Sequence, residues 1–178
     1  MTTVFHTTFH TPIGEMLCYT TEQGICLLEF TDRKNLNEEI VQLLEQLQAT
    51  LVEKQHLHHH TVRRQLSEYF DKKRQEFLLP VVPSGTAFQQ SVWLALQDIP
   101  YGKTISYKQQ AEAMAKPSAI RAIAAANGKN RIAIVIPCHR VVGSTGSLTG
   151  YGGGLWRKEW LLNFEQDKPT VKQEKLAF

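Results

Sequence analysis

The first thirty residues alternate between short runs of β-forming residues and turn residues. Residues 4–9, 15–20 and 25–30 are rich in β-branched and aromatic side chains, and residues 12–14 and 22–24 separate them with proline and glycine. Runs of this length between such turns are typical of strands. The pattern therefore predicts an antiparallel meander at the start of the chain.

Apolar residues at helical intervals follow this meander. Residues 35–51 carry leucine and isoleucine three and four positions apart, which predicts a helix, and a second helix is expected over residues 61–72. The four histidines before it are expected to lie in a loop: His56, His58, His59 and His60. Residues 77–85 contain two prolines and a glycine, which indicates a linker between two parts of the chain.

Beyond the linker the pattern is mainly helical. Helices are expected over residues 86–97 and 106–114, and a third begins at Ser118, a favourable N-cap, and runs to about Asn127, with Gly128 as its C-terminal cap. The last two resemble a helix-turn-helix. The third helix carries five alanines, with Arg121 as its only long side chain. Its backbone can therefore approach another surface closely, or pack tightly inside the protein.

The segment Ile-Val-Ile-Pro-Cys-His-Arg-Val-Val at residues 134–142 is the most informative of the chain. Its apolar β-branched run predicts a buried strand. Pro137 cannot donate to a sheet ladder, so the strand must end or bend there. Cys138 follows directly, beside the potential cations His139 and Arg140. Because positive neighbours favour the nucleophilic thiolate, we expect Cys138 to be a reactive thiol.

The distribution of charge along the chain indicates a polyanionic partner. The chain has 178 residues, of which 42% are hydrophobic and 21% charged, as in soluble globular proteins with one large or two small domains. Residues 1–82 carry a net charge of −3 and residues 83–178 a net charge of +6, and no acidic residue lies between Glu112 and Glu159. A field of one sign favours polyanions, although a solvated basic face is the alternative.

Cysteine usage and the N-terminus indicate the cellular compartment. The chain shows no signal-peptide pattern and no apolar run of membrane-spanning length. Three cysteines, an odd number, favour reduced thiols in the cytoplasm, with a Cys18–Cys26 disulfide as the less favoured alternative. A helix is expected from residue 155 to about residue 165, followed by a polar tail that frays.

Several motifs together resemble one family. Residues 137–142, the glycine-rich stretch 143–154 with Tyr151, and Arg-Lys-Glu-Trp-Leu-Leu at 157–162 resemble the O6-alkylguanine-DNA alkyltransferases. The resemblance extends over about residues 3–166, and includes residues 11–14, 88–101, 104–107, 121–123 and Asn130. It implies an α/β N-terminal domain similar to the ribonuclease H core (residues 1–82), a mostly helical, winged-helix-like DNA-binding and alkyl-acceptor domain (86–168), and a polar tail (169–178).

The resemblance also implies a reaction that needs no cofactor. The alkyl group on O6 of guanine, and on O4 of thymine, would move irreversibly to Cys138, once per protein molecule. The implied catalytic residues are Cys138, His139, Glu165, Tyr107 and Asn130. In the family, a water links the histidine to the thiol and a glutamate orients the imidazole. Helical periodicity does not decide between Glu165 and Glu159 for this role, whereas the resemblance favours Glu165.

The family extracts the damaged base from duplex DNA through the minor groove. Arg121 resembles the residue that fills the vacated space. Most contacts are expected to be with the DNA backbone. The protein is expected to act as a monomer and not to associate with a membrane. The implied DNA-binding residues are Arg121, Ser106, Ala122, Arg140 and Lys116. The implied base pocket consists of Val141, Tyr151, Gly152 and Lys158. The family often has serine at the position of Gly152, but a backbone N–H donor survives this difference.

The sequence departs from the family pattern at several positions. Arg131 stands where the family commonly has proline, and Ile123-Ala124 replaces Val-Gly. Some members bind zinc, but no convincing set of four ligands accompanies Cys18 here, so no metal is expected.

One alternative function is that of a protein that binds alkyl lesions without transferring the alkyl group, although such relatives lack the cysteine. The other is a cysteine hydrolase, which needs an oxyanion site and repeated turnover.

Overall fold

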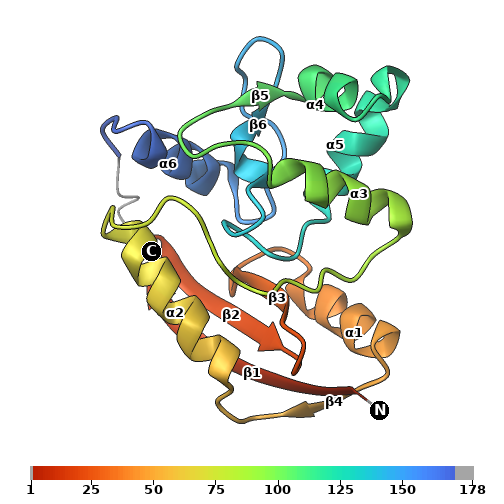
Figure 1. Cartoon of the computed structure of the whole chain (residues 1–178), viewed down its shortest axis with the longest axis vertical. Helices are drawn as coiled ribbons and strands as arrows, with labels where there is room; N and C mark the ends of the chain where they lie inside the picture. Colours follow the sequence, from red (N-terminus) through yellow and green to blue (C-terminus); the bar gives the residue numbers. More distant parts are fainter. Residues whose placement is uncertain (1, 171–178) are drawn as a thin grey trace, which may run out of the picture.

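A four-stranded sheet forms the base of the molecule in the computed structural model, which describes residues 2–170. The strands β1 (Thr2–Thr11), β2 (Gly14–Thr20) and β3 (Ile25–Phe30) form the predicted antiparallel meander. A short strand, β4 (Ala49–Val52), pairs in parallel with β1, giving the order β3-β2-β1-β4 (Figure 1).

The two faces of this sheet belong to different cores, because neighbouring side chains of a strand point to opposite sides. Leu27 lies on the side of the helix α1 (Leu36–Gln46), and Cys26 joins it there because the pairing of β2 and β3 shifts register between Tyr19 and Thr20, which interrupts the alternation. Leu28 and Phe30 face the other side, where α2 (Leu57–Phe70) and the second half of the chain cover the sheet. Figure 1 shows α1 and α2 flanking the strands.

Two predictions for this half were wrong. The helix expected to run to residue 51 ends at Gln46, because Gln48 has a left-handed φ of 48° and the residues after it join the sheet as β4. The histidine segment is not a loop, because α2 begins there. His56 Nδ1 accepts from the N–H of His58 (3.3 Å), and His59 Nδ1 accepts from the N–H of His56 (3.2 Å). Imidazole nitrogens thus cap the helix reciprocally.

The second half is mainly helical, as predicted. Its elements are α3 (Ala87–Leu96), β5 (Ile105–Ser106), α4 (Tyr107–Ala113), η1 (Pro117–Ala119), α5 (Ile120–Gly128), η2 (Cys138–Arg140), β6 (Val141–Val142) and α6 (Leu155–Glu165). Ser118 is not the N-cap of α5, because it lies within the 3₁₀ turn η1 and Ala119 precedes the helix without a side-chain cap. The strands β5 and β6 pair in parallel, which joins the start of α4 to the segment after Cys138.

The buried strand predicted before Pro137 is absent from the described chain. Residues 133–135 form a turn, and Ile134 has a left-handed φ of 69°, which a strand does not allow. Instead, the segment makes a single bridge with the β3 edge: Leu28 donates to the carbonyl of Arg131 and accepts from the N–H of Ala133, each at 2.8 Å. The chain approaching Cys138 is thereby fixed to the N-terminal sheet.

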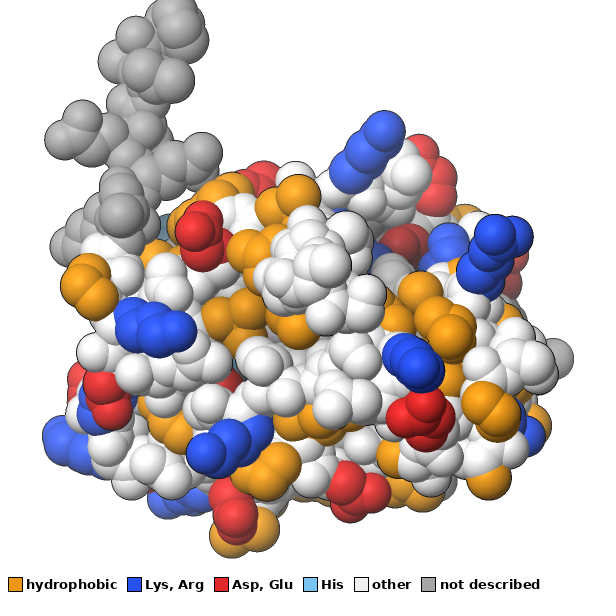
Figure 2. Space-filling model, turned by 90° about the horizontal axis from the view of Figure 1, so that it is seen from above, with side chains coloured by type: hydrophobic (Ala, Val, Ile, Leu, Met, Phe, Trp, Pro, Cys, Tyr) orange, Lys and Arg blue, Asp and Glu red, His pale blue; other side chains and the backbone are white. Residues whose placement is uncertain are grey.

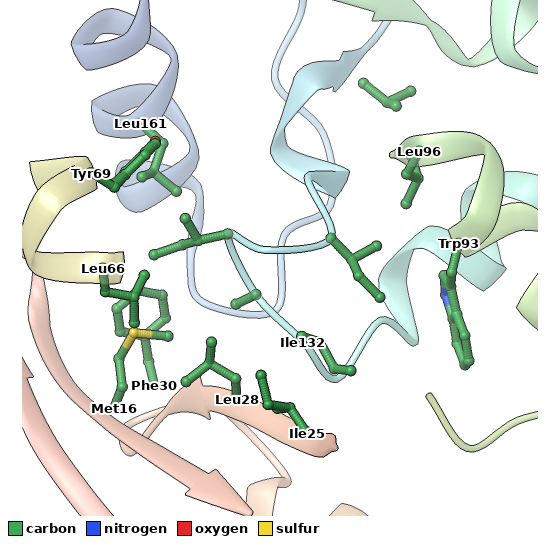
Figure 3. Close-up of a cluster of buried hydrophobic side chains, with 14 of the residues drawn as sticks. Met16, Ile25, Leu28, Phe30, Leu66, Tyr69, Trp93, Leu96, Ile132 and Leu161 are labelled. Atoms are coloured by element: carbon green, nitrogen blue, oxygen red, sulfur yellow. The ribbon is translucent and has the colours of Figure 1, made fainter. Parts of the chain in front are cut away.

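One hydrophobic core joins the two halves of the chain (Figure 3). It contains residues of the sheet, of α2, of α3 and of α6, including Met16, Leu28, Phe30, Leu66, Tyr69, Trp93, Leu96 and Leu161. The linker is also fixed, because Val81 bridges Ile25 of β3. Between residues 2 and 170, no helix is long and apolar enough to cross a membrane.

Candidate active site

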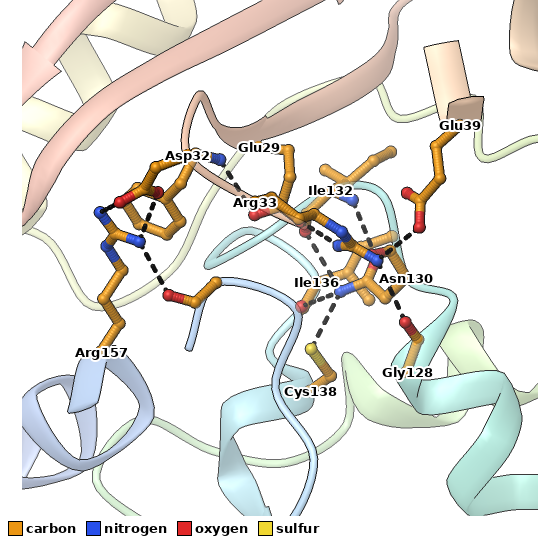
Figure 4. A network of polar contacts seen from close by, with 12 residues as sticks. Glu29, Asp32, Arg33, Glu39, Gly128, Asn130, Ile132, Ile136, Cys138 and Arg157 are labelled. Atoms are coloured by element: carbon orange, nitrogen blue, oxygen red, sulfur yellow. Dashed lines mark hydrogen bonds and ion pairs between the residues drawn. The ribbon is translucent and has the colours of Figure 1, made fainter. Parts of the chain in front are cut away.

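Cys138 lies at the start of η2, where the chain bends after Pro137, and its side chain is half-buried. The Asn130 amide donates from Nδ2 to Cys138 Sγ (3.3 Å) and to the carbonyl of Ile136 (2.9 Å). Its Oδ1 accepts from the N–H of Ile132 (3.0 Å). Asn130 therefore holds the turn before the cysteine and directs an N–H at the sulfur (Figure 4).

On the other side of η2, several polar groups donate hydrogen bonds to Glu165. It is buried, and it accepts hydrogen bonds from His139 Nε2 (2.9 Å), Arg140 Nε (2.9 Å) and Nη2 (3.0 Å), the Tyr69 hydroxyl (2.8 Å) and the Gly102 N–H (3.1 Å). Burial opposes ionisation, but His139 and Arg140 outweigh it and hold the pKa of Glu165 well below its usual range. Glu159 is exposed, so the geometry favours Glu165 as the partner of His139.

The sequence predicted a Cys138 thiolate beside two cations, whereas the structure indicates other protonation states for Cys138 and His139. Burial lowers the pKa of His139 despite the attraction of Glu165. Burial also raises the pKa of Cys138, although the Asn130 N–H, Lys158 and Arg33 oppose this shift. Arg140 is paired with Glu165 rather than with the sulfur. The free protein therefore holds a neutral thiol, a neutral imidazole and a carboxylate near neutral pH.

Tyr107 and Lys158 meet at one carbonyl. The Tyr107 hydroxyl donates to Thr149 O (3.0 Å), and Lys158 Nζ donates to the same oxygen (2.9 Å). Lys158 is fully buried, and its Nζ lies 5.7 Å from the centre of the Tyr107 ring. The β5–β6 pairing places Ile105 beside the buried Val141, and so brings the start of α4 next to η2. The predicted pocket residues come from β6, the glycine-rich loop and α6, and the predicted catalytic Tyr107 comes from α4.

Two buried polar atoms near this site have no hydrogen-bond partner among the described residues: His139 Nδ1 and the Tyr151 hydroxyl. Burial, as the main cause, and the negative charge that Cys138 would carry as a thiolate raise the pKa of Tyr151. Buried polar groups are normally paired. These two atoms are therefore candidates to bind substrate or solvent.

Three of the predicted DNA-binding residues are accessible: Arg121 and Ala122 on α5, and Lys116 just before η1. Ser106 is half-buried and caps α4, where its Oγ accepts from the N–H of Gln109 (3.1 Å). Figure 2 shows the molecule from above in the orientation of Figure 1, with separate Lys, Arg, Asp and Glu side chains scattered over a mainly uncharged surface.

Arg140 does not belong with the DNA-binding residues, and its assignment was wrong. Only 6% of it is exposed. Its guanidinium donates to both carboxylate oxygens of Glu165 and to the carbonyl of Ile99 (2.6 Å). A buried guanidinium with these partners cannot reach a phosphate.

The residues present do not fit a zinc site. Cys18 and Cys26 are free and buried in the two separate cores of the sheet. Burial raises the pKa of Cys26 to about 12, which disfavours the thiolate that a metal requires. Among residues 2–170, no group of three or more His, Cys, Asp or Glu side chains could hold a metal ion.

Sequence reasoning missed two residues that reach the site from the N-terminal half. Tyr69 lies on α2, and nothing in the sequence indicated Glu165 as its partner, 96 residues away. Arg33 lies in a charged stretch after β3 and donates to the carbonyl of Asn130 (3.0 Å). No local sequence pattern predicts either contact, because both depend on how the two halves of the chain pack.

Comparisons with known proteins agree with the resemblance. The family model for the ribonuclease-like domain of 6-O-methylguanine DNA methyltransferase matches residues 4–83, and the model for its DNA-binding domain matches residues 87–167. A methylated-DNA–protein-cysteine methyltransferase of Methanosarcina barkeri is 42% identical over 164 residues, which cover 92% of this chain and 98% of the relative. The constitutive enzyme of this name in Bacillus subtilis is 40% identical over 164 residues, covering 91% and 95% of the two chains.

A solved structure gives the same result. The chain superposes on Mycobacterium tuberculosis OGT, crystallised in complex with DNA, with a TM-score of 0.77. The two chains are 36% identical, and the match covers 93% of each.

Proposed function

The chain belongs to the 6-O-methylguanine DNA methyltransferase family, and on this premise we propose that it repairs DNA by alkyl transfer to its own cysteine. The alkyl group on O6 of guanine, or on O4 of thymine, moves to Cys138 Sγ. One observation carries the proposal: a half-buried sulfur receives the Asn130 N–H directly before the buried His139–Glu165 pair. A carboxylate, an imidazole and a thiol in this order can move a proton away from sulfur.

The reaction is a displacement at carbon. His139 Nδ1 takes the thiol proton through a water, and Glu165 balances the positive charge that develops on the imidazole. Sγ attacks the alkyl carbon, an S–C bond forms, and the O6–C bond breaks with its electron pair going to guanine. Tyr107 turns its hydroxyl from Thr149 to the guanine ring nitrogen and donates a proton there, and the former thiol proton held on His139 restores the phenol through solvent. The thioether has no easy leaving group, so each molecule reacts once.

Access to the base requires its removal from the duplex, which costs on the order of a few kcal/mol. The exposed alanine face of α5 enters the minor groove, and Arg121 fills the space of the extruded nucleotide. Ser106, Ala122 and Lys116 contact the DNA backbone. Binding is therefore sensitive to salt and nearly independent of sequence. The protein acts on double-stranded DNA as a monomer in the cytoplasm.

The extruded base enters the pocket beside η2. Val141, Tyr151 and Lys158 surround it, and the N–H of Gly152 donates to the guanine oxygen. The pocket belongs to residues 86–168, the proposed alkyl-acceptor domain, whereas residues 1–82 form the domain that supports it. The proposed polar tail, 169–178, lies outside the described residues apart from its first two positions.

Mass spectrometry of the protein after incubation with duplex DNA containing one O6-methylguanine tests the proposal. We expect one methyl group per protein molecule, located on the Cys138 peptide, and one restored guanine. Cys138→Ala should bind the duplex and leave the lesion intact. Binding without methylation of the native protein would instead indicate a lesion-binding protein, and repeated turnover of an ester or amide would indicate a hydrolase. Either result overturns the proposal.

A further inference from the structure

Arg33, in the turn between β3 and α1, reaches across to the segment that ends α5. It is only 8% exposed. Its Nη1 donates to the carbonyl of Asn130 (3.0 Å), and its Nη2 donates to the carbonyl of Gly128 (3.1 Å). Two carboxylates hold the same guanidinium from the N-terminal side: Glu29 pairs with Nη1, and Glu39 pairs with Nη2 at 3.0 Å (Figure 4).

These contacts supply hydrogen-bond donors to the carbonyl groups at and after the end of α5. The last carbonyls of a helix have no partner within it, and a buried carbonyl without a partner is costly. Gly128 ends α5, and Asn130 follows in the turn. A guanidinium presents several N–H groups in a rigid fork, so it can bind both carbonyls at once, which a lysine cannot do with the same geometry.

The turn that Arg33 holds carries the side chain that donates a hydrogen bond to the sulfur. Asn130 uses its backbone oxygen for Arg33 and its side-chain amide for Cys138 Sγ (3.3 Å). A displacement of its backbone would therefore move the N–H that faces the thiol. The contact links two segments of the chain 97 residues apart.

Arg33 also supports the glycine-rich loop. A Cβ added to Gly152 would lie 2.5 Å from the Arg33 guanidinium, so a larger residue there would require the loop or the arginine to shift. Serine, which the family often has at this position, would displace either the loop or the arginine. The glycine and the arginine therefore fit each other.

We propose that Arg33 is a positioning residue for alkyl transfer, through which the N-terminal half fixes the Asn130 turn and the glycine-rich loop around Cys138. It acts through Asn130 and does not touch the base or the sulfur. The proposal rests on the function proposed above. It extends that function by assigning the N-terminal half a role in the reactivity of the thiol.

The charges around Cys138 give this role a measurable signature. After burial, Glu29 raises the pKa of Cys138, whereas the Asn130 N–H, Lys158 and Arg33 lower it. As a thiolate, Cys138 would also raise the pKa of Tyr107 and of Tyr151, in each case after burial as the main cause. Weakening the Arg33 contacts loosens the Asn130 donor, so the thiol should need a higher pH to react.

The test uses variants that keep the buried charges balanced. Glu29→Gln with Arg33→Gln removes the fork together with one of its two carboxylates, so the net charge of the cluster is unchanged although Glu39 loses its partner, and Arg33→Lys keeps the charge but loses the fork. The matched control is Asp32→Asn, which weakens a neighbouring ion pair between the two halves (Asp32–Arg157, 2.7 Å) that does not contact Asn130. Thermal unfolding of each variant shows whether it folds.

The readout is the rate constant for reaction of Cys138 with a free O6-alkylguanine base and with iodoacetamide, each as a function of pH. We expect the balanced double variant to lose on the order of 10-fold or more with the free base, because small misplacements at a reacting centre are costly. Its iodoacetamide profile should move to higher pH. Arg33→Lys should lie between the double variant and the native protein, and Asp32→Asn within about twofold of native.

A double-mutant cycle with Asn130→Ala shows whether Arg33 acts through Asn130. We expect Arg33→Lys to cost little further rate once the Asn130 side chain is gone. Fully additive losses, or native rates in a folded double variant, would overturn the proposal. The iodoacetamide profile requires no alkyl transfer, so it tests Arg33 even if the native protein fails to repair DNA, and the two failures are distinguishable.

Discussion

His139 donates to Glu165 across 2.9 Å, and neither side chain has any exposed surface. The same carboxylate oxygen, Oε1, also accepts from Tyr69 and from Arg140. Three donors on one oxygen fix the carboxylate, and the carboxylate in turn fixes which imidazole nitrogen remains available for the thiol. This relationship between α6 and η2 makes two predictions about the reaction.

Replacing Glu165 with glutamine should reduce alkyl transfer on the order of 100-fold, because the positive charge on His139 would lose its balance. It should also destabilise the protein by about 3–5 kcal/mol, because Arg140 would be left buried without a carboxylate. Single-turnover kinetics and denaturant unfolding measure the two effects. Glu159→Gln, an exposed change on the same helix, is the control and should alter neither. Native kinetics in a folded Glu165→Gln protein would contradict the proton-transfer role.

The pH profile of transfer should be flat on the acid side of neutrality. The reactive state requires neutral His139, and burial lowers the pKa of His139 below its ordinary value of 6.5. Lowering the pH from 7.5 to 6.5 should therefore leave the rate constant unchanged within about twofold, and the fall should begin only at lower pH. Stopped-flow measurement with an oligonucleotide substrate tests this expectation. A midpoint at or above 6.5 would show that the imidazole is more easily protonated than its burial requires.

The fold was predictable wherever a local pattern fixed the structure. The meander, α3, α4 and α6 follow from periodicity and turn residues, and Cys138 follows from its neighbours. The strand expected before Pro137 failed because β-branched residues suit any tightly packed site, and the segment 132–136 packs as a turn against β3. Propensity alone does not distinguish these two environments.

The candidate site was predictable only within its own half of the chain. The resemblance implied that Arg140 binds DNA, and the sequence could not show that this residue is buried against a carboxylate 25 residues further along. Tyr69 and Arg33 contact the site across 96 and 97 residues. Such contacts arise from packing between the two halves, for which the sequence carries no periodic signal.

Arg121→Ala should impair repair of duplex DNA on the order of 10-fold or more, and leave the reaction with free O6-alkylguanine base unchanged. The residue is exposed on α5, and base extrusion is needed only in a duplex. Lys116→Ala is the comparison, because loss of a phosphate contact should weaken binding and reduce its salt dependence without specifically affecting extrusion. Equal losses of Arg121→Ala on both substrates would place its role in the pocket instead.

The start of α2 should make the protein sensitive to acid independently of the thiol. His59 caps the helix through Nδ1 and contacts the Thr20 hydroxyl through Nε2 (3.0 Å). Burial, as the main cause, lowers the pKa of His59 from 6.5 to about 4, so the folded protein holds it neutral. Its contribution to stability is therefore complete above pH 6.5, and is lost as the pH falls from 6.5 to about 4.

Thermal unfolding of the native protein and of His59→Gln, each at pH 7.5 and pH 5.0, isolates this contribution. We expect the variant to be less stable at pH 7.5, because it loses the cap, but to lose fewer degrees on acidification than the native protein. The difference should be at least ~2–4 °C, the shift that about 1 kcal/mol produces in a chain of this size. His60→Gln, an exposed change one position along, should retain the native pH response. An equal response in the His59 variant would mean that other groups cause the sensitivity to acid.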